Sequence, residues 1–157
     1  MSVTSATGAS ELYCLLVPLV RRKILLPRDM IVEVTGTAGL RPPPSGSPSW
    51  HLGWRPWQDR LLPVLSLENY LGDPVPPSTS RSRLVCTLVL GGGTHTHYMF
   101  VTRGYPYLVR VTETVLRPDA QATPTPRLWA QFRFGNDRPV VPDIVRLERD
   151  LATLTAS

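Results

Sequence analysis

Apolar and polar residues alternate in short runs along this chain, and this pattern predicts many short β-strands. The clearest run is 128–134, where every second residue is apolar and Gln131 and Arg133 stand between apolar neighbours. The run 30–34 continues the pattern as a short helical turn or a strand. Further strands are expected at 12–20, 24–27, 60–66, 83–90, 97–102 and 107–115.

Turn-forming residues separate these runs. The segment 39–49, which is rich in Pro, Gly and Ser, predicts a loop, and a further loop is expected at 118–126. Gly72 is expected to end a single helical turn that begins at Leu67. We interpret residues 1–10, which are small and polar, as a disordered tail. Residues 11–157 then form one domain of two lobes, with the boundary between the lobes near 73–80.

The last part of the chain has helical spacing. Pro142 suits a first helical turn, and the residues that follow place their apolar side chains on one stripe. Leu147 and Leu151 lie one turn apart on this stripe, so both are expected to be buried. The apolar stripe consists of Ile144, Leu147, Leu151 and Leu154. The fold class is therefore all-β with one C-terminal helix, and the strand pattern resembles paired small barrels.

The amino-acid composition limits the possible domain organisation and the possible partners. A chain of 157 residues with 42% hydrophobic residues can form one compact domain or two small lobes, and 17 prolines favour short strands and turns. The net charge of +5 permits an acidic partner or a nucleic acid. The arginines, however, are spread along the chain and mostly alternate with apolar residues, which favours an ordinary solvated surface.

The sequence predicts a cytoplasmic protein without direct membrane insertion. The first ten residues lack the positive charge of a signal peptide, and the apolar run 12–20 is too short to span a bilayer and contains Pro18. Cys14 and Cys86 lie in separate apolar runs with no CxxC motif, which favours a reducing compartment.

No motif predicts catalysis, a cofactor or a metal. His95 and His97 could provide two zinc ligands from one strand edge, but no third ligand stands near them in the sequence. The run Gly91–Thr94 lacks the Lys-Ser/Thr of a phosphate loop, so it is interpreted as a hairpin turn. Neither a Gly-x-Ser-x-Gly motif nor paired acidic residues are present, so we expect no enzyme.

Three tryptophans gather within eight residues of one another. Trp50, Trp54 and Trp57 are interleaved with Arg55, and such a group could stack on bases or grip a peptide. The alternative is that some of them fill the core between the two lobes. A small nucleic-acid-binding barrel that uses these Trp and Arg residues is therefore the second function to consider.

The middle of the chain resembles the central motif of CheW-like domains, the coupling proteins of chemosensory systems. In the family, this motif consists of a Leu-Gly pair, a turn, and a strand that begins with Pro-Val or Pro-Ile. In this chain the pair is Leu52–Gly53, and the turn and strand correspond to the segment 57–68, which reads WQDRLLPVLSLE. The segment 24–34 is similar to the family's second strand and to its V-x-E-V/I element. Residues 141–148 resemble its closing strand and helix, so the similarity extends from about Leu12 to Leu151.

This resemblance implies a fold and a function. The fold would be two five-stranded SH3-like barrels that share a core, with a C-terminal helix. The function would be that of a non-catalytic adaptor between the regulatory domain of a CheA-like histidine kinase and the cytoplasmic tip of a methyl-accepting chemoreceptor, with no nucleic acid as partner. The tryptophan-rich centre and the segment 104–111 look closest to the ChpC-type branch, which serves chemosensory systems that control type IV pili and twitching motility.

The resemblance also assigns partner-binding residues. Ile31 and Val34 match the groove that the family offers to receptors, and a single helical turn would place both on one face. Trp57, Gln58 and Asp59 match the coupling turn. The family has Asn-Leu-Arg-Gly where this chain has Pro-Trp-Gln-Asp, so Gln58 replaces the arginine and cannot provide its charge or its two-pronged hydrogen bonding.

Overall fold

The computed structural model describes residues 11–73, 85–92 and 95–154, so the expected disordered tail at 1–10 lies outside the described residues. In chain order the described elements are β1 (Glu11–Pro18), β2 (Lys23–Pro27), a 3-10 helix (Arg28–Met30), β3 (Ile31–Thr35), β4 (His51–Trp57), β5 (Arg60–Ser66), α1 (Leu67–Tyr70), β6 (Val85–Leu90), β7 (His97–Thr102), β8 (Tyr107–Thr112), β9 (Leu116–Pro118), β10 (Leu128–Phe134), β11 (Val140–Pro142) and α2 (Ile144–Leu151).

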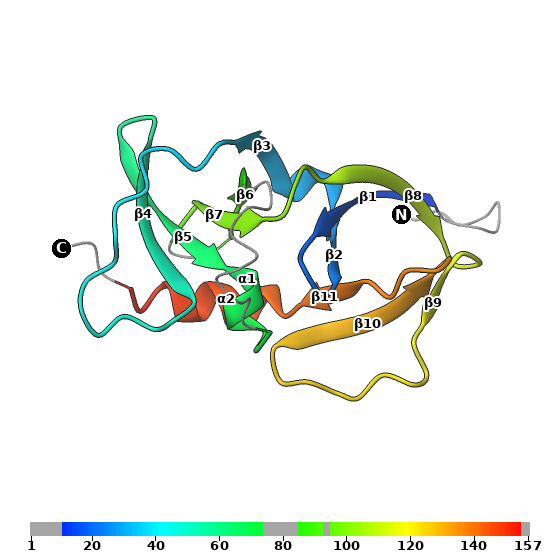
Figure 1. The fold of residues 1–157 in the computed structure, drawn as a ribbon. Coiled ribbons are helices and arrows are strands. Elements are labelled where there is room, and N and C mark those ends of the chain that lie inside the picture. Colours follow the sequence, from blue (N-terminus) through cyan, green and yellow to red (C-terminus); the bar gives the residue numbers. More distant parts are fainter. Residues whose placement is uncertain (1–10, 74–84, 93–94, 155–157) are drawn as a thin grey trace.

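The strands form two sheets, and each sheet builds one lobe (Figure 1). The first sheet has the order β8-β1-β2-β11-β10-β9, and the second has the order β3-β6-β7-β5-β4. The second sheet has the five strands that were expected. The first has six among the described residues, because the three-residue strand β9 pairs with β10 at its outer edge.

The chain passes between the lobes more than once. It leaves the first sheet after β2, forms all five strands of the second sheet, and returns to the first sheet at β8. The expected boundary at 73–80 lies almost entirely outside the described residues. The strands on either side of that segment, β5 and β6, belong to the same sheet, and the changes of sheet occur at Arg28–Met30 and at 103–106.

Alternating side chains divide the buried residues into three cores. One fills the first lobe, around Cys14, Leu16, Leu25 and Val111, and one fills the second lobe, around Leu62, Val64, Leu88 and Met99. The third and largest lies between the lobes and takes the alternate residues of the same strands, such as Val17, Ile24, Val89 and Phe100. Because a strand directs successive side chains to opposite faces, each of these strands contributes to its own lobe and to the shared core.

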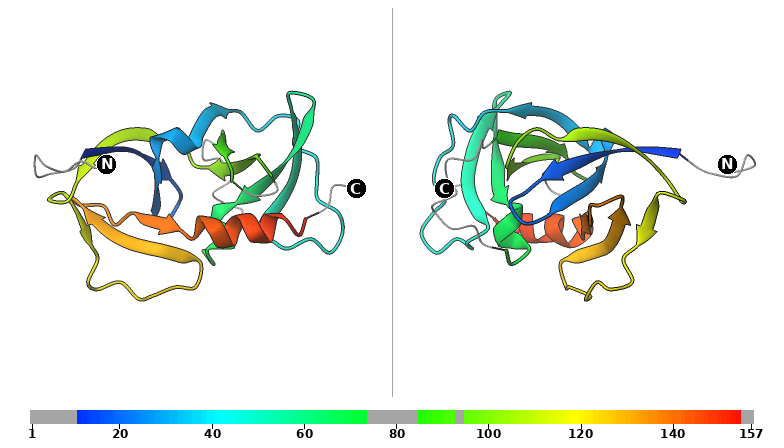
Figure 2. Two further views of the ribbon diagram at one scale, coloured as in Figure 1. Left: turned by 180° about the vertical axis from the view of Figure 1, so that it is seen from behind. Right: turned by 45° about the vertical axis from the view of Figure 1, so that its right-hand side comes forward.

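The C-terminal helix covers the shared core. Leu147 and Leu151 are 0% and 1% exposed, which confirms the predicted stripe. The helix α2 begins at Ile144, where the carboxylate of Asp143 caps it by accepting from the backbone N–H of Arg146. Pro142 is therefore the last residue of β11 and not part of the first helical turn. Figures 1 and 2 show α2 running along the second lobe directly after β11.

A buried ion pair joins segments from both lobes. Glu68, which is 4% exposed in α1, lies 3.1 Å from the Nε of Arg103 in the segment that returns to the first lobe. Its second carboxylate oxygen accepts from the backbone N–H of Val20, which follows β1. Since a buried carboxylate needs partners for its charge, this residue fixes the lobes against one another.

Candidate functional site

A tight turn between β4 and β5 presents the predicted coupling residues. Trp57 pairs with Arg60, and the two residues between them form the turn with positive φ angles, 46° at Gln58 and 64° at Asp59. Positive φ at both central residues is the geometry of a type I′ turn, which follows the twist of a hairpin. Gln58 and Asp59 are both exposed at its tip.

The predicted groove residues lie on β3, and a β-bulge places them on one face. Ile31 pairs with Val89 and Val34 pairs with Thr87, with the register shift between them. Cross-strand partners share a face, and Val89 and Thr87 are two residues apart, so Ile31 and Val34 point to the same side of the sheet. Of the two alternatives predicted for this segment, the strand is the one observed, and the bulge in that strand, not a helical turn, produces the shared face.

This face of β3 continues the shared core. Ile31 is partly buried and packs against the core between the lobes, and Val34 is partly buried three residues further on. Val32, which lies within the bulge, is 46% exposed. The strand therefore changes from core to surface along its length.

Trp57 connects the turn to β3. Its indole Nε1 donates to the Oε1 of Glu33 at 3.0 Å, and its ring packs against the ring of His97 with centroids 4.8 Å apart. The same indole packs against the second-lobe core. Sequence reasoning assigned the groove and the turn separately. In the structure Glu33 connects the turn to the strand that carries the groove residues, on the face opposite to Ile31 and Val34.

Arg55 makes a second connection between the same two strands. Its Nη1 donates to the hydroxyl of Thr35 and to the carbonyl oxygen of Gly36 at 2.7 Å. The strands β3 and β4 are the two edges of the second sheet and have no backbone ladder between them. A backbone bridge between Arg41 and Trp54 covers part of the β4 edge. The side chain of Arg55 provides a further connection from β4 to the end of β3.

Arg60 places a guanidinium beside the turn. Its Nη1 donates to the hydroxyl of Thr96 at 2.9 Å and lies 3.5 Å from the Nδ1 of His97. Neither partner carries a negative charge, so the positive charge of Arg60 is not neutralised by them. The sequence analysis did not assign Glu33 or Arg60 to this site, and it considered His97 only as a possible zinc ligand. The pairing of Trp57 with Arg60 follows from a two-residue turn, so hairpin register was the signal that could have identified Arg60.

The clustered tryptophans have different environments. Trp50 and Trp54 are 8% and 5% exposed, so two of the three are core residues, while Trp57 is partly buried at the turn. A fourth, Trp129, is 72% exposed on β10. Because Trp50 and Trp54 are buried, they cannot stack on bases at the surface.

His51 is a buried histidine next to these tryptophans. It is 3% exposed, its Nε2 lies 3.0 Å from the carbonyl oxygen of Gly53, and its ring meets Trp54 edge to face. Burial lowers the pKa of His51 below its usual value of 6.5, because a charged imidazolium loses hydration there. Its Nδ1 has no hydrogen-bond partner among the described residues.

No metal centre or membrane helix is found in the described part of the chain. No three His, Cys, Asp or Glu side chains within 11–73, 85–92 and 95–154 are placed to hold one ion together. His95 and His97 instead face different tryptophans, Trp54 and Trp57. None of the helices in the same ranges is long and apolar enough to cross a membrane.

Neither a protein-family model nor a curated protein matches this sequence. Among solved structures, the chain is similar to a scaffolding protein, CheW from Thermoanaerobacter tengcongensis, with a TM-score of 0.70 over 91% of both chains and 11% sequence identity. This chain has the CheW fold. The expected class, an all-β protein of two SH3-like barrels with a C-terminal helix, is thereby confirmed.

Proposed function

We propose that this chain is a non-catalytic adaptor that couples a chemoreceptor to a CheA-like histidine kinase. The observation that carries the proposal is the similarity of the whole fold, over 91% of both chains, to a protein described as a scaffold. The proposal needs no cofactor and no metal, and it assigns the protein to the cytoplasm.

Two neighbouring surfaces would hold the partners. The face of β3 with Ile31 and Val34 offers a partly exposed apolar strip that suits an amphipathic helix, such as the tip of a receptor hairpin. The β4–β5 turn, with Trp57, Gln58 and Asp59, offers an exposed tip for the kinase's regulatory domain. An adaptor of this kind changes kinase activity only by binding one state of the complex more tightly than another.

The hydrogen bond between Trp57 and Glu33 supports coupling between these surfaces. It connects the turn to the strand that carries Ile31 and Val34, so a displacement of one surface is transmitted to the other. Arg60 supports the same assignment, because it supplies a guanidinium next to Gln58, where the resembling family has its arginine.

We further propose that the partners belong to a ChpC-type system that controls type IV pili and twitching motility. The support for this finer assignment is the sequence of the tryptophan-rich centre, with the segment 104–111. The nucleic-acid alternative loses much of its support, because Trp50 and Trp54 are core residues and Arg55 is bonded to β3.

Affinity capture from the source organism tests the adaptor proposal. The tagged chain and its Trp57→Ala variant are used as bait, and the bound proteins are identified by mass spectrometry. The proposal expects a CheA-like kinase and a chemoreceptor with the unchanged chain and a loss of at least one of them with the variant. Recovery of neither protein by the unchanged chain would contradict it.

A further inference from the structure

Two arginines oppose one another on the outer strands of the first lobe. Arg117 on β9 pairs directly with Arg133 on β10, and both side chains are exposed. Like charges placed directly opposite one another destabilise a strand pair. This pair therefore does not stabilise the fold.

The nearby acidic side chains have other partners. The Oδ1 of Asp119 accepts from the backbone N–H of Gln121 at 3.1 Å, and the Oδ1 of Asp137 lies 2.8 Å from the Nζ of Lys23. Within the part of the chain that the structure describes, neither Arg117 nor Arg133 takes part in an ion pair or a hydrogen bond. Both guanidinium groups are therefore free to bind an anion from another molecule.

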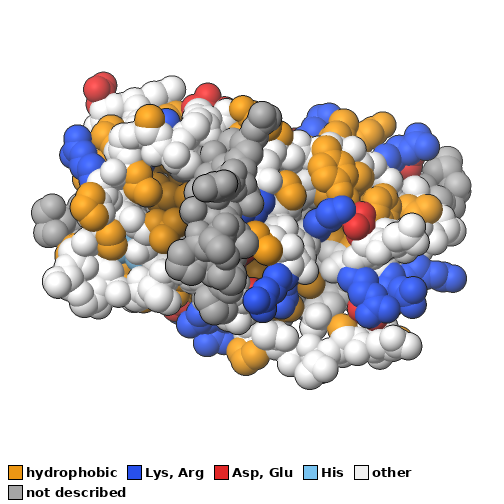
Figure 3. Space-filling view, viewed as in Figure 1, with side chains coloured by type: hydrophobic (Ala, Val, Ile, Leu, Met, Phe, Trp, Pro, Cys, Tyr) orange, Lys and Arg blue, Asp and Glu red, His pale blue; other side chains and the backbone are white. Residues whose placement is uncertain are grey.

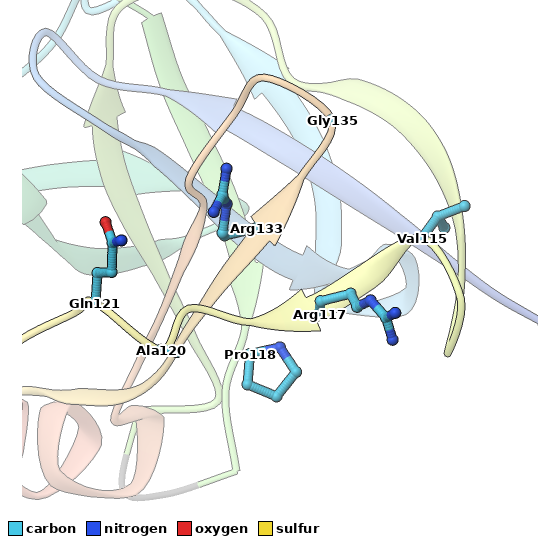
Figure 4. Close-up of a pocket in the computed structure, with 7 residues that line it drawn as sticks. All are labelled: Val115, Arg117, Pro118, Ala120, Gln121, Arg133 and Gly135. Atoms are coloured by element: carbon cyan, nitrogen blue, oxygen red, sulfur yellow. The ribbon is translucent and has the colours of Figure 1, made fainter.

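A cavity of about 420 Å³ lies over this strand pair, and both arginines line it together with Gln121. Figure 4 shows the two guanidinium groups leaving the strands in different directions. Side chains that diverge do not surround one small ion, but they can each bind one of two separate anionic groups. None of the described residues that line the cavity is aromatic, so they offer no platform for stacked bases.

The first lobe carries the positive charge of the described chain. Residues 11–30 and 103–143 contain ten Lys and Arg against six Asp and Glu, whereas residues 31–73 contain three against four. Figure 3 shows the blue side chains gathered over the first lobe, on the right. A partner that approaches this lobe with negative charge is therefore favoured by the long-range field as well.

We propose that the β9–β10 surface binds an acidic, extended segment of a protein partner, with Arg117 and Arg133 each binding one carboxylate. The planar guanidinium group suits a carboxylate because it donates two parallel hydrogen bonds. A nucleic acid fits less well, because none of the described residues that line the cavity is an aromatic on which its bases could stack. This surface lies on the opposite lobe from β3 and the β4–β5 turn, and the proposal is independent of the adaptor function.

Fluorescence anisotropy at low salt tests the proposal. The probes are a labelled ten-residue peptide of alternating Glu and Ser, the same peptide with Gln in place of Glu, and a labelled 12-mer of thymidine. The unchanged chain is compared with Arg117→Gln/Arg133→Gln and with Arg28→Gln/Arg149→Gln, a control that removes two exposed charges elsewhere. A third variant, Arg133→Glu, replaces the like-charge pair with an opposite-charge pair.

The proposal expects the Glu peptide to bind at least tenfold tighter than the Gln peptide. The Arg117/Arg133 double variant should lose at least tenfold of this affinity, and the control variant less than twofold. Arg133→Glu should lose binding while its melting temperature stays equal or rises, which separates loss of binding from loss of fold. Equal losses in the two double variants, no preference for the Glu peptide, or tighter binding of the thymidine 12-mer that depends on both arginines would each overturn it.

Discussion

The indole Nε1 of Trp57 donates to the Oε1 of Glu33 at 3.0 Å, and this bond joins the tip of the β4–β5 hairpin to the middle of β3. The two residues are 24 positions apart in the sequence. The bond spans the two edge strands of the second sheet, where no backbone ladder exists. It therefore joins the hairpin tip to β3 from the face of the strand opposite to Ile31 and Val34.

The first prediction concerns this bond. Trp57→Phe keeps an aromatic ring over the second-lobe core but removes the donor, and Glu33→Val removes the acceptor. Each change should weaken partner binding by roughly 3-fold to 10-fold, which corresponds to a hydrogen bond of about 0.5–1.5 kcal/mol. The double variant should bind the partner with the same affinity as either single variant, because all three lack the same interaction.

A double-mutant cycle with the captured kinase or receptor, measured by calorimetry, checks this prediction. Glu33→Gln serves as a control, since its amide oxygen still accepts a hydrogen bond and should retain most of the affinity. Additive losses in the cycle would show that the two side chains act separately.

The second prediction concerns the groove. Val34→Glu should abolish receptor binding while the free energy of unfolding changes by less than about 1 kcal/mol, because Val34 lies where β3 passes from core to surface. The same change at Val145, which is 70% exposed on α2, should leave binding unaltered. If Val34 is purely a core residue, the variant buries a carboxylate and loses stability instead, as a denaturant titration would show.

Much of the fold could be predicted from the sequence. The strands 60–66, 97–102 and 128–134 have the predicted bounds. The first two are short, largely apolar runs, and the third alternates between apolar and polar residues. The apolar stripe of α2 was also correct. These features depend on the spacing of apolar residues within one segment, and this spacing can be read directly from the sequence.

Features that depend on distant residues could not be predicted. The strand β11 has three residues and pairs in parallel with β2 through Val140 and Ile24, so no local pattern marks it, and only the family resemblance of 141–148 pointed to a closing strand there. The bulge in β3 depends on its register with β6, which is more than fifty residues further along the chain. For the same reason the candidate site was predicted as two separate surfaces, since the partner of Trp57 is known only once β3 and β4 are placed together.

A second bulge altered the face assignment on β10. The register shifts between Leu128 and Ala130, and Leu128 consequently packs against the shared core, whereas Phe132 and Phe134 pack in the first lobe. The alternation had placed all four apolar residues of this strand on one face. A single extra residue in a strand reverses the direction of every side chain before it.

The third prediction concerns the shared core. Leu147→Ala should lower the free energy of unfolding by roughly 2–5 kcal/mol, because the leucine is fully buried between α2 and both sheets. Val145→Ala, on the exposed side of the same helix, should change it by less than about 0.5 kcal/mol. Urea unfolding followed by circular dichroism measures both, and equal values would mean that α2 does not cover the core.

The fourth prediction is a loss of stability in mild acid that depends on His51. The pKa of this histidine is below 6.5 in the folded chain and close to 6.5 in the unfolded chain. Between those two values the unfolded state binds more protons, so stability falls as the pH drops below about 6.5. The slope contributed by His51 approaches at most about 1.4 kcal/mol per pH unit.

Unfolding free energies measured between pH 7.5 and 5.0 check this prediction. His51→Phe, which cannot titrate, should show a smaller decrease over this range than the unchanged chain. His95→Gln removes a histidine that is only partly buried and should keep the decrease. The same pH dependence in His51→Phe as in the unchanged chain would exclude His51 as its source.

Receptor control of kinase autophosphorylation is the most direct test of the adaptor proposal. The CheA-like kinase and the chemoreceptor of the same organism are combined in membranes with and without this chain, and the initial rate of phosphate incorporation is measured. The account predicts that the receptor changes the rate only when the chain is present, and that Val34→Glu removes the effect. A receptor-dependent rate that is the same with and without the chain would contradict it.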